Sequence, residues 1–194
     1  MIQKLGKEVI TIIYLFITIS SLVFFIEFYS MITSSNFESI LIIYSIETVF
    51  YWVFLLGIIW FIHKSQLYNS QREVKNLKYS PNWIWIWWFI PLLNLWMPYK
   101  VVKETYLSSF QVKKNKLNAE DTSILMSWWG CWIIGLLLPV IAGVINRNAY
   151  NGAEIALFLV LVSSIFIIFS AFYFITIIRK ISENEIITLK NEAN

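Results

Sequence analysis

The chain has 194 residues, of which 58% are hydrophobic and 14% are charged, and its mean hydropathy is +0.66. Soluble domains carry about a quarter charged residues, and a chain of this size needs a polar surface in water. Lipid must therefore cover much of this protein. The net charge of +3 is too small to indicate specific nucleic-acid recognition.

The residue types that most often hold metals and cofactors are scarce. Cys131 is the only cysteine and His63 is the only histidine. The chain therefore cannot form an intrachain disulfide, a cysteine zinc site or a haem held by two of its own histidines. It also has no glycine-rich phosphate loop and no HExxH motif. We expect no cofactor, no metal site and no catalytic residue. We interpret Cys131 and His63 as ordinary packing or interfacial residues.

The first apolar run covers residues 9–32 and follows Lys4 and Lys7. It is too long for a signal peptide and has no A-x-A cleavage site, whereas about 20 apolar residues cross the hydrocarbon core as a helix. A second apolar run covers residues 40–62. Both runs are predicted to be transmembrane helices.

Residues 83–98 are also apolar, but they are not predicted to cross. A helix over 83–97 would rise roughly 22 Å, short of the ~30 Å hydrocarbon core, and Pro91 interrupts helical hydrogen bonding. Basic residues flank the segment on both sides: Lys64, Arg72, Lys75 and Lys78 before it, and Lys100 and Lys103 after it. A crossing would put one of these groups outside, against the positive-inside rule.

This segment is therefore predicted to be re-entrant or interfacial on the cytoplasmic side. Its tryptophans suit the headgroup level; they are Trp83, Trp85, Trp87, Trp88 and Trp96. We expect Pro91, Asn94 and Pro98 to form its turn, with Asn94 bonding to the interrupted backbone. Residues 99–112, with Lys100 and Glu104 as an i,i+4 pair, are predicted to form a cytoplasmic surface helix. The flanking basic residues are expected to face anionic lipid.

Two more crossings are predicted at 124–145 and 153–178, and residues 183–194 are typical of a solvated, frayed cytoplasmic tail. Four crossings place both termini in the cytoplasm, together with every lysine and arginine except Arg147. The sequence thus predicts an all-α integral membrane protein. Residues 1–182 form a single polytopic domain with four transmembrane helices, the re-entrant or interfacial segment and the surface helix.

Glu27 and Glu47 are expected at a similar depth on adjacent helices, roughly 8–11 Å from their outer ends. Intramembrane carboxylates usually face a partner or a water-filled cavity. The pair could bind a cation or share a proton, and it could equally pair with Arg147 or reach the interface. The fourth helix also carries a stripe of small residues: Ala156, Ser163 and Ser170. Such a stripe suits packing within the chain or, alternatively, self-association.

A specific motif covers residues 80–109: SPNWIWIWWFIPLLNLWMPYKVVKETYLSS. With Trp60, Asn69 and Leu77 it resembles a bacterial membrane-protein family, domain of unknown function 4328. The matching positions are Ser80, Pro81, Trp83, Phe89, Pro91, Asn94, Leu95, Pro98 and Tyr99, and the tryptophan pair at 128 and 129 resembles the start of the family's next helix. The resemblance extends over roughly residues 50–180. It implies a small polytopic protein and brings no activity with it.

Three classes of function are compatible with these features. We expect a non-enzymatic regulatory or accessory protein of the bacterial cytoplasmic (inner) membrane, acting through membrane lipid or a cytoplasmic protein partner. The alternative is an oligomeric channel or pore, including one used in stress or antiphage defence. A membrane enzyme has the least support, because the apolar helices show no nucleophile–base pair.

Overall fold

The structure is a computed structural model that describes residues 2–33, 38–71, 77–90, 93–112, 119–148 and 152–192. These ranges are almost entirely helical, as predicted. The elements in chain order are α1 (Ile2–Thr33), α2 (Glu38–Gln71), the 3₁₀ turn η1 (Pro81–Trp83), α3 (Ile84–Phe89), the 3₁₀ turn η2 (Leu93–Leu95), α4 (Met97–Val112), α5 (Ala119–Asn148) and α6 (Gly152–Glu192).

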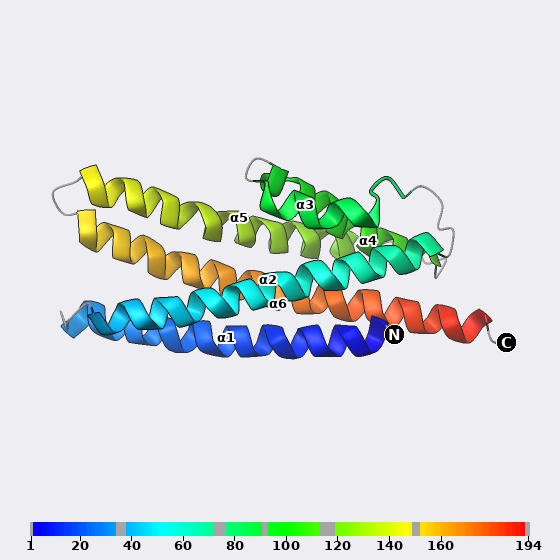
Figure 1. Ribbon diagram of the computed structural model, residues 1–194, viewed down its shortest axis with the longest axis horizontal. Coiled ribbons are helices and arrows are strands. Elements are labelled where there is room, and N and C mark those ends of the chain that lie inside the picture. Colours follow the sequence, from blue (N-terminus) through cyan, green and yellow to red (C-terminus); the bar gives the residue numbers. More distant parts are fainter. Residues whose placement is uncertain are drawn as a thin grey trace.

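Four of the described helices, α1, α2, α5 and α6, are long and apolar enough to cross a membrane. They lie side by side along the long axis of the molecule and alternate in direction, so both chain ends lie toward the same end of the bundle (Figure 1). The prediction of an all-α protein with four transmembrane helices is confirmed.

The four helices pack unevenly. α6 lies between α1 and α5, and α1 also packs against α2. The α5–α6 contact is the most extensive, and a Cβ atom at Gly135 would lie only 2.5 Å from Cδ1 of Ile167. By contrast, α2 and α5 meet through aromatic rings. The centroid of the Trp132 ring on α5 lies 6.1 Å from that of Tyr51 and 6.3 Å from that of Phe54, both on α2. This looser side of the bundle leaves room for another element.

A helical hairpin, formed by residues 81–90 and 93–112, occupies that side. Its α3 arm contacts α2, and its α4 arm contacts α6, α2 and, to a lesser extent, α5. Both arms lie along the part of the bundle nearer the chain ends (Figure 1). Trp88 of α3 meets Trp132 edge-on at 6.1 Å, so the hairpin joins the aromatic core of the bundle.

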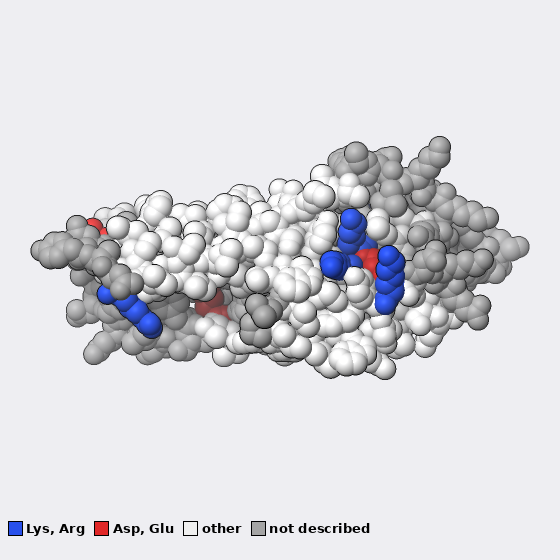
Figure 2. Space-filling view, turned by 90° about the horizontal axis from the view of Figure 1, so that it is seen from above, with Lys and Arg blue, Asp and Glu red and all other residues white. Residues whose placement is uncertain are grey.

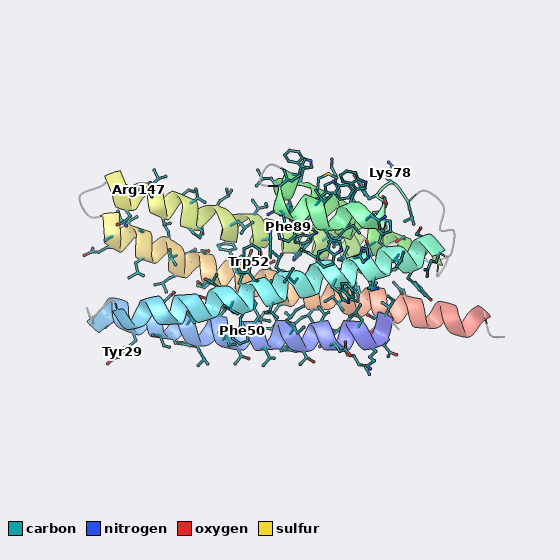
Figure 3. All side chains as sticks on the ribbon, in the orientation of Figure 1. Tyr29, Phe50, Trp52, Lys78, Phe89 and Arg147 are labelled. Atoms are coloured by element: carbon teal, nitrogen blue, oxygen red, sulfur yellow. The ribbon has the colours of Figure 1, made fainter. Side chains whose placement is uncertain are left out.

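Charged side chains lie toward the two ends of the molecule. Arg147 is at one end and Lys78 is toward the other, with the uncharged side chains of Trp52 and Phe89 between them (Figure 3). On the face drawn in Figure 2, described basic side chains lie at two places, and the described residues in the broad band between them are uncharged apart from one recessed acidic group. Such a band is what a hydrocarbon layer requires of the surface it covers.

All four spanning helices extend beyond the apolar runs from which they were predicted. α2 continues past residue 62 to Gln71, and α6 continues to Glu192 in place of the frayed tail that was predicted from residue 183. The reason is that α4 packs against these extensions and buries their polar side chains, among them Gln66, Asn69 and Asn184. Hydropathy predicts the lipid-covered part of a helix and misses a part that protein covers.

The α4 helix runs along the bundle and does not lie across its end as the predicted surface helix would. The Thr105 hydroxyl of α4 donates to Oε1 of Gln66 on α2. Three residues further along α4, the Ser108 hydroxyl accepts from Nδ2 of Asn69. Both partners advance by three residues, which shows that α4 and the end of α2 run side by side in the same direction. Val101, Val102 and Tyr106 are fully buried, so protein covers the apolar face of α4.

Candidate functional site

The α3 arm of the hairpin runs antiparallel to the C-terminal half of α2. Nδ1 of His63 donates to the Pro81 carbonyl oxygen at 3.0 Å, and the Trp85 ring lies 6.1 Å from the His63 ring. Further along, Phe89 stacks on Trp52 at 6.5 Å (Figure 3). His63 follows the predicted span 40–62 directly, and Trp52 stands near the middle of that span. The two residues are eleven positions apart, so α3 follows α2 over about 16 Å, which is half the thickness of a ~30 Å hydrocarbon core.

The chain reverses direction between α3 and α4. The Asn94 N–H donates to the Ile90 carbonyl oxygen at 2.8 Å, and Pro98 lies in the first turn of α4, where its missing N–H costs no helical bond. Asn94 thus closes the reversal through its backbone. Its buried side-chain oxygen, which was expected to bond to the backbone, has no hydrogen-bond partner among the described residues. Pro91 lies outside the described residues.

Glu104 of α4 holds the base of the hairpin together. Its Oε1 accepts from Gln66 Nε2 at 2.7 Å and from the Tyr79 N–H at 3.1 Å, while its Oε2 accepts from the Lys78 N–H at 3.0 Å. Hydrogen bonds to an ionised acceptor are roughly twice as strong as neutral ones. The carboxylate of Glu104 on α4 thus binds both α2 and the segment that precedes the hairpin at Lys78 and Tyr79. It makes these bonds in place of the predicted pair with Lys100.

Buried polar side chains continue this network along α4. Asn69 donates from Nδ2 to the Ser108 hydroxyl at 2.7 Å. On the other side of α4, Nδ2 of Asn184 donates to the Ser109 hydroxyl at 3.3 Å. These bonds link α4 to α2 and to α6, so the hairpin is a fixed part of the fold.

The five tryptophans predicted to be interfacial have three different surroundings. Trp83 and Trp96 are on the outside of the hairpin, 54% and 43% exposed, as an interfacial anchor requires. Trp85 and Trp87 are half-buried against neighbouring rings. Trp88 is only 3% exposed, because it fills the space beside α5; it is a packing residue and not the anchor that was predicted.

Four of the six basic residues predicted to face lipid are described: Lys64, Lys78, Lys100 and Lys103; Arg72 and Lys75 lie outside the described residues. The Lys64 Nζ lies 4.7 Å from the centroid of the Trp60 ring, and the Lys103 Nζ lies 5.7 Å from that of Tyr99. These two lysines lay their stems along aromatic surface while the ammonium group stays near water. The other two are exposed.

A cavity of about 340 Å³ lies among the four spanning helices, and each of them contributes to its wall. Its residues on α2 and α5, including Glu47 and Pro139, lie further from the chain ends than those that contact the hairpin. The hairpin thus fills the part of the space between α2 and α5 that is nearer the chain ends, and the cavity occupies the part further from them. The uncharged face in Figure 2 is hollowed where its acidic group is recessed.

The two predicted membrane carboxylates are close together, but only Glu47 lines the cavity. Glu27 is 2% exposed and stands seven residues after Ser20 on α1, on the same helical face. Its carboxyl group interacts electrostatically with that of Glu47. Arg147 is exposed at the end of α5, and among the described side chains it forms no ion pair with either carboxyl group.

The stripe of small residues on α6 packs against α5. The Ser163 hydroxyl donates to the Gly135 carbonyl oxygen at 2.7 Å. That carbonyl lacks its helical partner because Pro139, four residues later, has no N–H. Ser163 and Ser170 are both buried within the chain, so they do not form a surface for self-association.

Residues 29–183 match the model of a family described as Domain of unknown function (DUF4328). The match includes α2, the hairpin and α5, and it covers well over half of the chain. The chain belongs to this family. No curated protein and no solved structure matches the chain.

In this DUF4328 chain, the residues that carried the resemblance build the hairpin. Gln66, which holds its base together with Glu104, was not singled out from the sequence, and Glu104 was named there only as a partner of Lys100. A signal was nevertheless present, because Gln66 and Asn69 stand three residues apart just after an apolar run, and Thr105 and Ser108 have the same spacing on α4. Two polar faces of equal pitch are what a buried helix–helix hydrogen-bond network needs.

Proposed function

We propose that this protein is a non-enzymatic accessory or regulatory protein of the bacterial cytoplasmic membrane, acting through contacts of its hairpin with anionic lipid. We propose that both termini and the base of the hairpin lie in the cytoplasm. The support for this orientation is the positive-inside rule, because all the described basic residues except Arg147 belong to segments at the end of the bundle that carries the termini.

The observation that carries the proposal is the outer surface of the hairpin. Trp83, Phe89 and Trp96 are exposed there, although the hairpin itself is fastened by the Glu104 network. Lys78 and Lys100 flank these aromatic residues in the chain. A rigid aromatic surface with lysines at its edge suits the level where acyl chains meet headgroups, and each lysine there attracts anionic lipid.

The test compares two pairs of lysines at the same end of the molecule. The full chain is placed in nanodiscs that contain phosphatidylcholine and phosphatidylglycerol, and retained lipid is measured by native mass spectrometry. Lys100→Gln with Lys103→Gln should lower the preference for phosphatidylglycerol roughly 30-fold, since each lysine contributes about 1 kcal/mol. Lys4→Gln with Lys7→Gln on α1 is the control and should lose less, because Lys4 is already 4.0 Å from Glu8.

Equal losses in the two pairs would show general charge attraction and would contradict a role for the hairpin surface. The same holds if the unmodified protein retains both lipids equally. Ion flux through liposomes that contain the purified protein, above the background of empty liposomes, would favour the alternative of an oligomeric channel.

A further inference from the structure

We propose that the cavity among α1, α2, α5 and α6 binds a small hydrophobic organic cation. This site is separate from the hairpin surface, and the inference does not depend on the proposed lipid contacts. It rests on the charge of the cavity, its size and lining, and a buried hydroxyl group on its wall.

The charge at the cavity favours a cation. Glu47 lines it, and the carboxyl group of Glu27 lies close enough to act on Glu47 electrostatically. Carboxyl groups within a membrane are costly and usually face a partner or a water-filled cavity. In such surroundings the attraction between opposite charges is far stronger than in water, so a positively charged ligand beside Glu47 is stabilised.

The size and lining of the cavity favour an organic ligand over a metal ion. Its volume of about 340 Å³ is within the range of roughly 300–1,000 Å³ that is usual for small-molecule sites. Apolar side chains such as Phe16, Leu136 and Ile167 form much of the wall. Among the described residues, no three histidine, cysteine, aspartate or glutamate side chains gather to hold a metal.

Ser20 is the polar neighbour of Glu47 at the cavity. It is 1% exposed and lines the cavity, and its hydroxyl faces the Glu47 carboxyl group. The polar end of a ligand beside Glu47 therefore also meets this hydroxyl group.

The aromatic residues complete a site of this chemistry. The rings of Phe16 and Tyr51 both line the cavity, and their centroids are 6.1 Å apart. An ammonium group within about 6 Å of an aromatic centroid is attracted by the ring. A ligand with one ammonium group and an aromatic or alkyl body could therefore pair with Glu47 and place its apolar part against these rings.

The experiment uses benzyltrimethylammonium and its neutral isostere neopentylbenzene, which differ only in the exchange of nitrogen for carbon. Binding of the radiolabelled cation to the full chain in phosphatidylcholine nanodiscs is measured by equilibrium dialysis, with empty nanodiscs subtracted. We expect saturable binding at one cation per chain, and competition by neopentylbenzene that is at least tenfold weaker. Glu47→Gln should bind at least tenfold more weakly and Ser20→Ala about threefold more weakly.

Two further variants keep the result interpretable. Glu154→Gln makes the same change at an exposed position of α6 and should bind like the parent. Val160→Phe fills the cavity while keeping both carboxyl groups, and it should abolish binding even if Glu47→Gln does not fold. The proposal is overturned if the parent shows no saturable binding, if Glu154→Gln loses as much as Glu47→Gln, if Val160→Phe binds normally, or if sodium or calcium ions compete at equal concentration.

Discussion

Removing the carboxylate of Glu104 should loosen the base of the hairpin without unfolding the bundle. In Glu104→Ala, three hydrogen bonds to an ionised acceptor are lost. Bonds of this kind contribute roughly 1.5–3 kcal/mol each. The bond from the Lys78 N–H is exposed and counts least, and Gln66 keeps its bond to the Tyr79 carbonyl oxygen at 3.2 Å. We therefore expect a loss of about 3–5 kcal/mol in the free energy of unfolding.

Glu104→Gln should cost much less, because the geometry distinguishes its two oxygens. An amide oxygen in the place of Oε1 still accepts from Gln66 and from the Tyr79 N–H, and only the bond from Lys78 is lost. The expected cost is about 1–2 kcal/mol. Glu183→Ala, an exposed position on α6, is the control and should change the stability little.

The assay is unfolding in mixed micelles, combined with hydrogen exchange at the Tyr79 amide. Glu104→Ala should lower the unfolding midpoint and speed exchange at Tyr79, while amides in the middle of α6 keep their protection. If Glu104→Ala is as stable as Glu183→Ala and the Tyr79 amide exchanges as slowly as in the parent, the carboxylate does not hold the hairpin.

Two more predictions concern the membrane part of the fold. Ser163→Ala leaves the Gly135 carbonyl unpaired and should lower the free energy of unfolding by about 1–2 kcal/mol. Adding Pro139→Ala supplies the missing N–H and should recover most of that loss. If the effects of the two substitutions simply add in the same unfolding assay, this explanation is wrong. Trp132→Ala should lower the free energy of unfolding by about 3 kcal/mol, because it leaves a cavity between α2, α3 and α5. The control Trp83→Ala, at an exposed position, should lower it by less than about 0.5 kcal/mol. Equal losses would mean that Trp132 does not join these helices.

The four spans and the exception at residues 83–98 could be predicted from the sequence, because length, proline and the positions of basic residues all constrain a chain in a bilayer. The orientation of α4 could not. Its apolar face, which includes Val101 and Tyr106, would suit a membrane surface as well as another helix. Its partners on α2 and α6 are polar residues that come after the apolar runs, so hydropathy does not predict that these parts of the helices are buried.

The candidate sites show the same limit. The sequence placed Glu27 and Glu47 at a similar depth, but which carboxyl group lines a cavity depends on how each helix is rotated about its axis. That rotation is set by contacts such as the one from Ser163 to the Gly135 carbonyl, and periodicity alone does not reveal them. Trp88 differs from its neighbouring tryptophans for the same reason, because it alone points toward Trp132.

The proposed fold in the membrane requires that the chain between α2 and α5 enters the bundle and returns to the same side. Cysteine accessibility measures this directly, after Cys131→Ser removes the natural thiol. Single cysteines are introduced at Ser70, Ser123 and Asn146, all of them exposed, and are treated with an impermeant maleimide in intact cells. Asn146→Cys should react in intact cells, whereas Ser70→Cys and Ser123→Cys should react only after permeabilisation. If Ser70→Cys and Ser123→Cys react from opposite sides, the aromatic segment crosses the membrane and the hairpin assignment is wrong.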